Sequence, residues 1–281
     1  MSRRPSRPAR LAASALAGGV LLATAACSDG DGPGAAAEQA RPAEQPEAVR
    51  APSGSSTASP NASPSALSES GARAALVTEA DLEGDWNQVR DADKWRDRLL
   101  VGEVDVSGFL TARADAADCQ RLLDGLYRDD LLGEPSGPSA LTGFEQGDAR
   151  LLDQVAGYDR AGLDDRLKWL GSLPQECDEF TATGSGGDKR TVQVTEAPVP
   201  GVGDAREGLH VTVRGRADDT PVTLTLDVAA VRVGTSALTV TGGGLDGGQA
   251  ASVERAVRQG TERLKTVLDG GTPAPLPGDV D

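Results

Sequence analysis

The sequence predicts an α+β domain, an antiparallel sheet with helices packed on it, which forms a single domain after a disordered tether. Residues 209–240 alternate apolar and polar side chains in runs joined by short turns. Such runs must be antiparallel neighbours, because a parallel connection needs a crossover of a dozen or more residues. Residues 253–268 change to helical spacing, and this helix should cover one face of the sheet. The core has to come from residues 76–268, about 200 residues and the size of one domain.

The clearest strands lie in the C-terminal half. Residues 192–194 predict a short strand, and residues 209–213 predict a half-buried one in which leucine and valine alternate with polar residues. The same alternation over residues 222–228 slips by one position at Ala229-Ala230, which is typical of a β-bulge that bends a long strand. Residues 238–240 predict the last strand of this group.

The first half of the domain is expected to contribute two helices and a strand. One helix begins at Asp115, which would serve as its N-cap, and continues through Leu131. Residues 151–158 then predict a strand. A second helix covers residues 160–173, and Pro174 ends it.

Two cysteines, Cys119 and Cys177, lie inside the predicted domain. In an exported protein two such residues usually form one disulfide, and a bridge closing this loop would contribute about 4 kcal/mol on a chain-entropy estimate. A metal-binding pair is the alternative. Zinc takes about four nitrogen or sulfur ligands, and the chain has one histidine, so the number of available ligands favours the disulfide.

The N-terminus has the layout of an export signal. Four arginines within residues 3–10 precede a mostly apolar stretch at residues 11–26, which is short for a transmembrane helix. The segment ends in Leu-Ala-Thr-Ala-Ala-Cys, at Cys27. It resembles a bacterial lipoprotein signal, in which the cysteine receives a diacylglycerol and becomes the new N-terminus. Simple secretion with cleavage nearby is the alternative.

The expected organisation is a lipoprotein signal peptide at residues 1–26, a disordered linker at 27–72, the folded domain at 73–270 and a disordered tail at 271–281. The chain carries a formal charge of −15. Such a surface repels phosphates, so we expect no nucleic-acid partner. The expected partners are the cytoplasmic membrane, through the lipid anchor, and an unknown envelope ligand or protein.

The folded segment opens on Leu-Val-Thr-Glu-Ala-Asp-Leu-Glu-Gly-Asp-Trp at residues 76–86. A cysteine before an amphipathic helix, a second cysteine shortly before Phe180, and the strand phrase at residues 222–234 follow. This order of elements resembles the extracellular sensor domain of PknH-type actinobacterial Ser/Thr kinases and the free-standing lipoproteins that share it. The resemblance implies an α+β domain with a cleft for an extracellular ligand. Those sensor domains carry two disulfides, whereas this chain can form one, and any signalling would require a partner.

Two motifs have ordinary explanations. Residues 242–247 fit G-x-G-x-x-G between a strand and a helix, but a dinucleotide site needs a βαβ unit, and no further strand follows. We therefore interpret the glycines as a flexible link, and we expect no cofactor. His210, the sole histidine, is expected on the outer face of a strand as a surface or satisfied side chain. No Gly-x-Ser-x-Gly elbow accompanies it.

The aromatic residues give the one positive indication of a binding site. All eight lie between Trp86 and Phe180. They could line a cleft for a lipid or a sugar, or they could form the core of the first half. Trp86, Trp95 and Trp169 are the best candidates for such a cleft.

These observations predict a non-enzymatic, membrane-anchored extracellular domain that binds a ligand as a sensor does. A carrier of a hydrophobic envelope molecule is the second hypothesis, and a cell-wall hydrolase that uses carboxylates alone is the third. No metal is expected.

Overall fold

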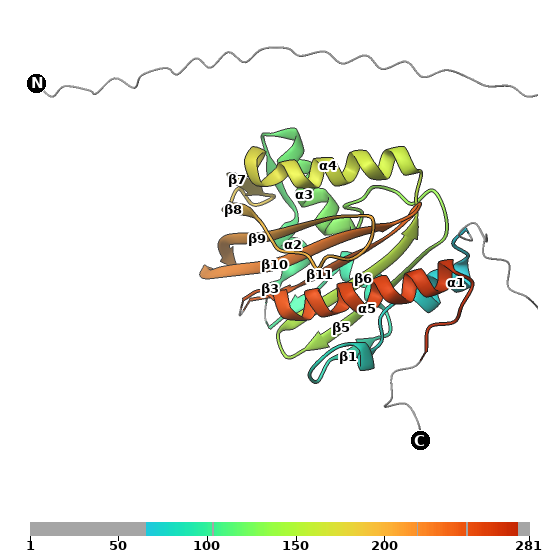
Figure 1. Ribbon diagram of the computed structural model, residues 1–281. Helices are drawn as coiled ribbons and strands as arrows, with labels where there is room; N and C mark the ends of the chain where they lie inside the picture. Colours follow the sequence, from blue (N-terminus) through green and yellow to red (C-terminus); the bar gives the residue numbers. More distant parts are fainter. Residues whose placement is uncertain (1–65, 103, 218, 246, 275–281) are drawn as a thin grey trace, which may run out of the picture. The chain divides into compact units, whose positions relative to one another are not determined.

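The computed structural model describes residues 66–274, apart from residues 103, 218 and 246, and these residues belong to one compact unit. They form a nine-stranded antiparallel sheet, a separate small hairpin and helices on both faces of the large sheet (Figure 1). The predicted α+β class is confirmed. In spatial order the large sheet contains β1 (Asn87–Val89), β5 (Ser139–Gln146), β6 (Ala149–Gly157), β11 (Ser236–Gly244), β10 (Thr220–Val233), β9 (Ala205–Ala217), β8 (Lys189–Glu196), β7 (Glu179–Gly184) and β4 (Ala112–Ala114).

Two groups of helices cover the opposite faces of the sheet. The terminal pair, α1 (Glu69–Ala75) and α5 (Ala250–Leu268), packs on one face. The other face carries α2 (Val106–Leu110), α3 (Ala117–Arg128) and α4 (Arg160–Glu176). Short 3₁₀ turns, η1 (Glu79–Asp81) and η2 (Ala92–Arg96), and the hairpin of β2 (Leu100–Val101) with β3 (Val104–Asp105) complete the described elements. None of the described helices is both long and apolar enough to cross a membrane.

The central strand β10 corrects the predicted bulge. Its pairing with β9 and with β11 runs in unbroken register on both sides. Val228 and Ala230 belong to the core beneath α3 and α4, whereas Ala229 and Val231 belong to the core beneath α5. Both faces of the strand are buried, so apolar residues occupy consecutive positions and the apparent slip of phase follows.

The glycine-rich stretch also differs from its expected role. Gly242, Gly243 and Gly244 are the last residues of β11, paired with β6 and β10, and are not a flexible link. A β-carbon at Gly242 would lie 2.7 Å from Val253 Cγ2 of α5. One at Gly243 would lie 2.0 Å from the Thr225 carbonyl oxygen. The glycines are needed for close packing, which explains them without a nucleotide.

The helices of the first half have slightly different ends from those predicted. α3 has Ala116 rather than Asp115 at its N-cap, and it stops at Arg128 because Asp129 adopts a left-handed conformation with φ 58°. Leu131 lies beyond the helix but is buried, because the chain changes direction after α3 and Leu131 packs against Gly125 of that helix. α4 continues through Pro174 to Glu176. A proline near the end of a helix removes only one backbone hydrogen bond, and the helix survives it.

The folded domain begins earlier than expected. The predicted linker extends to residue 72, whereas α1 starts at Glu69, with the Ser68 side chain accepting from the Gly71 N–H at 3.0 Å. Gly71 and Ala72 are buried, and a β-carbon at Gly71 would lie 2.9 Å from Val267 of α5. The small residues that resemble a tether by composition allow this close approach between helices. Cys27, the signal segment and residues 275–281 lie outside the described residues.

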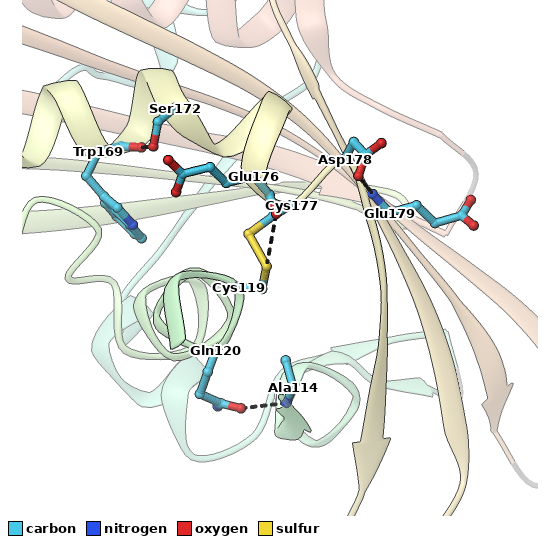
Figure 2. The surroundings of a disulfide bond; sticks show 9 residues. All are labelled: Ala114, Cys119, Gln120, Trp169, Ser172, Glu176, Cys177, Asp178 and Glu179. Atoms are coloured by element: carbon cyan, nitrogen blue, oxygen red, sulfur yellow. Dashed lines mark hydrogen bonds between the residues drawn. A yellow bond between two sulfur atoms is a disulfide. The ribbon is translucent and has the colours of Figure 1, made fainter. Parts of the chain in front are cut away.

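The predicted disulfide between Cys119 and Cys177 is confirmed. It joins the first turn of α3 to the residue that follows α4 (Figure 2). Both cysteines are buried within the core on that face of the sheet. Next to the bridge, the Gln120 side chain accepts a hydrogen bond from the Ala114 N–H at 2.7 Å, which ties the start of α3 to β4.

Candidate functional site: the Trp95–Asp129 cleft

A cavity of about 70 Å³ lies between the sheet and the layer formed by η2, the β2–β3 hairpin, α2 and the end of α3. Its lining is mainly apolar, and we call it the Trp95–Asp129 cleft after the two side chains that distinguish it. The lining residues are Trp95, Arg96, Leu99, Val101, Val106, Ser107, Leu110, Leu126, Tyr127, Asp129, Arg150, Leu152, Leu224, Leu226, Thr241, Gly243 and Gly244.

Trp95 forms part of the apolar wall from η2. Its ring lies on Gly143 of β5, where a β-carbon would come within 2.9 Å of the ring carbon Cη2. Because Gly143 has no side chain, the indole ring of Trp95 can pack directly on the backbone of β5. Trp95 is partly exposed, so one part of the ring packs and another part remains accessible from the cleft.

Arg150 of β6 closes the cleft on the side of the small hairpin. Its guanidinium donates to the carbonyl oxygens of Gly147 at 2.8 Å, Ala149 at 2.9 Å and Leu100 at 3.1 Å. It also lies 3.8 Å from the carboxylate of Glu145. These backbone acceptors use its donors, so Arg150 holds β2 against the sheet and is a structural wall of the cleft.

Asp129 supplies the carboxyl group that lines the cleft. It is held at the end of α3 by its left-handed backbone, and no donor among the described residues hydrogen-bonds to its carboxyl group. Burial raises the pKa of Asp129 to about 7, and the positive charge of Arg96 opposes this shift. A partly buried carboxyl group that accepts no hydrogen bond from the protein is available to a ligand that provides the donor.

A wider groove of about 540 Å³ adjoins the cleft and shares Arg96 and Asp129 with it. The groove is polar, and its acidic side chains include Asp93, Asp130 and Glu134. Burial is also the main cause that raises the pKa of Asp130. The small apolar cleft therefore opens beside a larger acidic groove, with Asp129 at the boundary between the two.

The structure does not bring the three candidate tryptophans together. Trp95 lines the cleft. Trp86 is buried in the core beneath α1 and α5, on the other face of the sheet. Trp169 of α4 is buried in the core on the cleft's side of the sheet, with the Arg121 guanidinium 4.3 Å from its ring centre. Two of the three are therefore core residues, as the alternative interpretation of the aromatic residues expected.

Sequence reasoning missed Asp129 and Arg150. Asp129 follows the last apolar position of a helix among other acidic residues, and its sequence neighbours give no sign that it turns inward. Arg150 approaches Leu100, fifty positions earlier, only because β2 folds back on the sheet. Within the described parts of the chain, no three histidine, cysteine or acidic residues are grouped so as to hold a metal ion.

Comparison with solved structures gives a distant likeness. The chain is similar to the extracellular domain of PknH from Mycobacterium tuberculosis, with a TM-score of 0.40 and 10% identity, over 74% of this chain and 100% of that chain. No protein-family profile and no curated protein matches the chain. The likeness agrees with the predicted resemblance only as a distant relationship of fold, and no function follows from it.

Proposed function

We propose that the chain is an exported lipoprotein whose folded domain binds an extracellular ligand in the Trp95–Asp129 cleft. In this proposal the lipidated Cys27 anchors the protein to the outer face of the cell membrane, and the domain binds without catalysing a reaction. The basic and apolar N-terminal segments support export. The Cys119–Cys177 disulfide supports an oxidising compartment.

The observation that carries the binding proposal is the carboxyl group of Asp129. It is partly buried, accepts no hydrogen bond from the described residues and lies where an apolar cavity meets a polar groove. Pockets for small molecules combine these features, an apolar lining with a few polar groups that fix orientation. The ligand that fits has a small apolar part against Trp95 and a hydrogen-bond donor for Asp129.

The size of the cleft disfavours a carrier of a hydrophobic envelope molecule. A long hydrocarbon chain needs a continuous apolar cavity, whereas the apolar cavity is about 70 Å³ and holds only a small apolar part of a ligand. The adjoining groove is large enough for a ligand, but its lining is polar and charged. An acyl chain would therefore have no continuous apolar path in this conformation.

Hydrolysis by carboxylates is the second candidate function, because the raised pKa of Asp129 suits a general acid and other carboxyl groups share the groove. A glycosidase would need one of them placed about 5–9 Å away to act as nucleophile or base. Release of soluble fragments from labelled cell wall by the parent protein, and not by an Asp129→Asn variant, would support hydrolysis and contradict simple binding.

Native mass spectrometry of the full chain purified from its own host tests the binding proposal. We expect a bound mass that is lost on denaturation. A Trp95→Ala variant should lose it, because the variant removes the apolar wall, and Asp129→Asn should reduce it by about tenfold or more through the weakened charged hydrogen bond. Asp165→Asn, at an exposed position on α4, is the matched control and should retain it. Absence of any adduct on the parent, or equal retention in all variants, would contradict the cleft as the site.

The anchor has a separate test. A Cys27→Ala variant expressed in the native host should move from the membrane fraction to the soluble fraction, because the acceptor of the two acyl chains is gone and a single weak contact does not hold a protein on a bilayer. Fractionation followed by immunoblotting measures this change. Equal amounts of parent and variant in the membrane fraction would reject lipidation at Cys27.

A further inference from the structure

On the face of the sheet that α5 covers, three polar residues lie in one row across neighbouring strands. His210 of β9 is opposite Thr195 of β8 on one side and opposite Asp227 of β10 on the other. His210 Nδ1 and Asp227 Oδ1 are hydrogen-bonded at 2.7 Å. Its side chain is 41% exposed, so the expectation of a surface or satisfied histidine is confirmed. The imidazole is both fixed on one side and accessible on the other.

Asp227 is the unusual member of this row. Its side chain is 6% exposed, and its Oδ2 atom has no hydrogen-bond partner among the described residues. An ionised carboxylate only accepts hydrogen bonds, so in the neutral form of His210 that pairs with it the proton is on Nδ1 and Nε2 has the lone pair. A carboxylate bound to one imidazole nitrogen orients the ring and makes the other nitrogen a stronger acceptor.

His210 and Asp227 line a cavity of about 280 Å³, between the sheet, the first turn of α5 and the segment after β8. Apolar atoms of Pro200, Ala229 and Val253 form part of its wall. Two exposed carboxylates, Glu196 and Glu254, also line it, and Glu254 is paired with Arg258 of the same helix. Among the described residues, no lysine or arginine lines the cavity itself. The cavity therefore offers hydrogen-bond acceptors and negative charge, and its apolar wall can hold a short aliphatic group.

We propose that this cavity binds a small aliphatic ammonium group, with Nε2 of the neutral His210 imidazole accepting one of its N–H donors and the carboxylates of Asp227 and Glu196 balancing its charge. Asp227 is a positioning residue, because it fixes the imidazole and adds negative charge behind it. The short hydrocarbon part of the ligand lies on the apolar wall. The site is on the opposite face of the sheet from the Trp95–Asp129 cleft and does not depend on the function proposed for that cleft.

The single histidine makes the test direct. In the full chain labelled with ¹⁵N-histidine, one imidazole gives all side-chain nitrogen signals, so a shift of Nε2 reports on His210 alone. We expect n-butylammonium chloride to shift this signal in a saturable way. Tetramethylammonium chloride has the charge but no N–H donor, and its apparent affinity should be at least about tenfold lower. Absence of saturation with n-butylammonium, or an equal response to both cations, would overturn the proposal.

A variant pair tests the role of Asp227 in the same titration. Asp227→Asn keeps the shape of the side chain and removes its charge, and it should weaken n-butylammonium binding by about tenfold or more. Asp219→Asn makes the same chemical change at a fully exposed turn position and should leave binding unchanged. If Asp227→Asn fails to fold, the comparison of the two cations on the parent still decides the proposal. Equal affinity in a folded Asp227→Asn variant would contradict it.

Discussion

Replacement of both bridge cysteines, in a Cys119→Ala/Cys177→Ala variant, lowers the free energy of unfolding by about 4 kcal/mol. The bridge spans 58 positions, and without it the unfolded chain regains the freedom of a long open loop. Both cysteine side chains are buried in the core, so water does not fill the space that their sulfur atoms leave in the folded variant. Denaturant unfolding followed by circular dichroism measures the change by linear extrapolation.

The third cysteine provides the control for this experiment. Cys27→Ala changes the same kind of residue outside the folded domain and should leave the stability of the domain at the parent value. Unfolding of the parent in a reducing agent should approach the stability of the double variant. An unfolding midpoint of the parent that does not change on reduction would contradict the bridge as a main source of stability.

The strand pattern shows which part of the fold could be predicted from sequence. The antiparallel group β8 to β11 and the helix α5 follow from alternation, short turns and a change of period, all of which are local signals. The predicted bulge at Ala229-Ala230 is wrong because the pattern there is set by tertiary packing. Burial of both faces of β10 depends on helices far away in the sequence, and no local pattern distinguishes it from a slip of register.

The boundary of the domain and the candidate site could not be predicted from local sequence patterns. Gly71 and Ala72 have the composition of a tether, and only the close approach of α5 makes them part of the core. The cleft likewise depends on contacts between distant segments, such as Trp95 on Gly143. Trp95 could be proposed because large aromatic residues are few in this chain, whereas Asp129 is one of many acidic residues and becomes distinct only through its burial.

One buried acid gives the domain a pH dependence. Asp153 of β6 is fully buried beneath α1 and α5, and its Oδ2 accepts a hydrogen bond from the Val77 N–H at 3.0 Å. Its Oδ1 has no partner within the described part of the chain. Burial raises the pKa of Asp153 to about 7, although the Val77 N–H and the charge of Arg263 oppose the shift. The folded state therefore keeps a proton that the unfolded state releases near its ordinary value of 3.8.

The sign of the effect follows from this difference. The stabilisation is fully present below the unfolded pKa and is lost as the pH rises through about 7, so the domain should be less stable at pH 8 than at pH 5. Between pH 5 and pH 8 the contribution of Asp153 to this loss is about 3 kcal/mol, and Asp129, whose pKa is raised in the same direction, adds to it. Urea unfolding at the two pH values measures the loss.

Asp153→Asn isolates the buried acid. The amide oxygen can still accept from Val77, and the side chain is neutral at both pH values, so the variant should lose much less stability between pH 5 and pH 8 than the parent. The remaining loss should come from groups such as Asp129, which still titrates. Asp165→Asn, a change of the same kind on the exposed surface of α4, should show the full loss of the parent. A parent equally stable at both pH values, or an Asp153→Asn variant with the parent's pH dependence, would show that this carboxyl group is not the source of the loss.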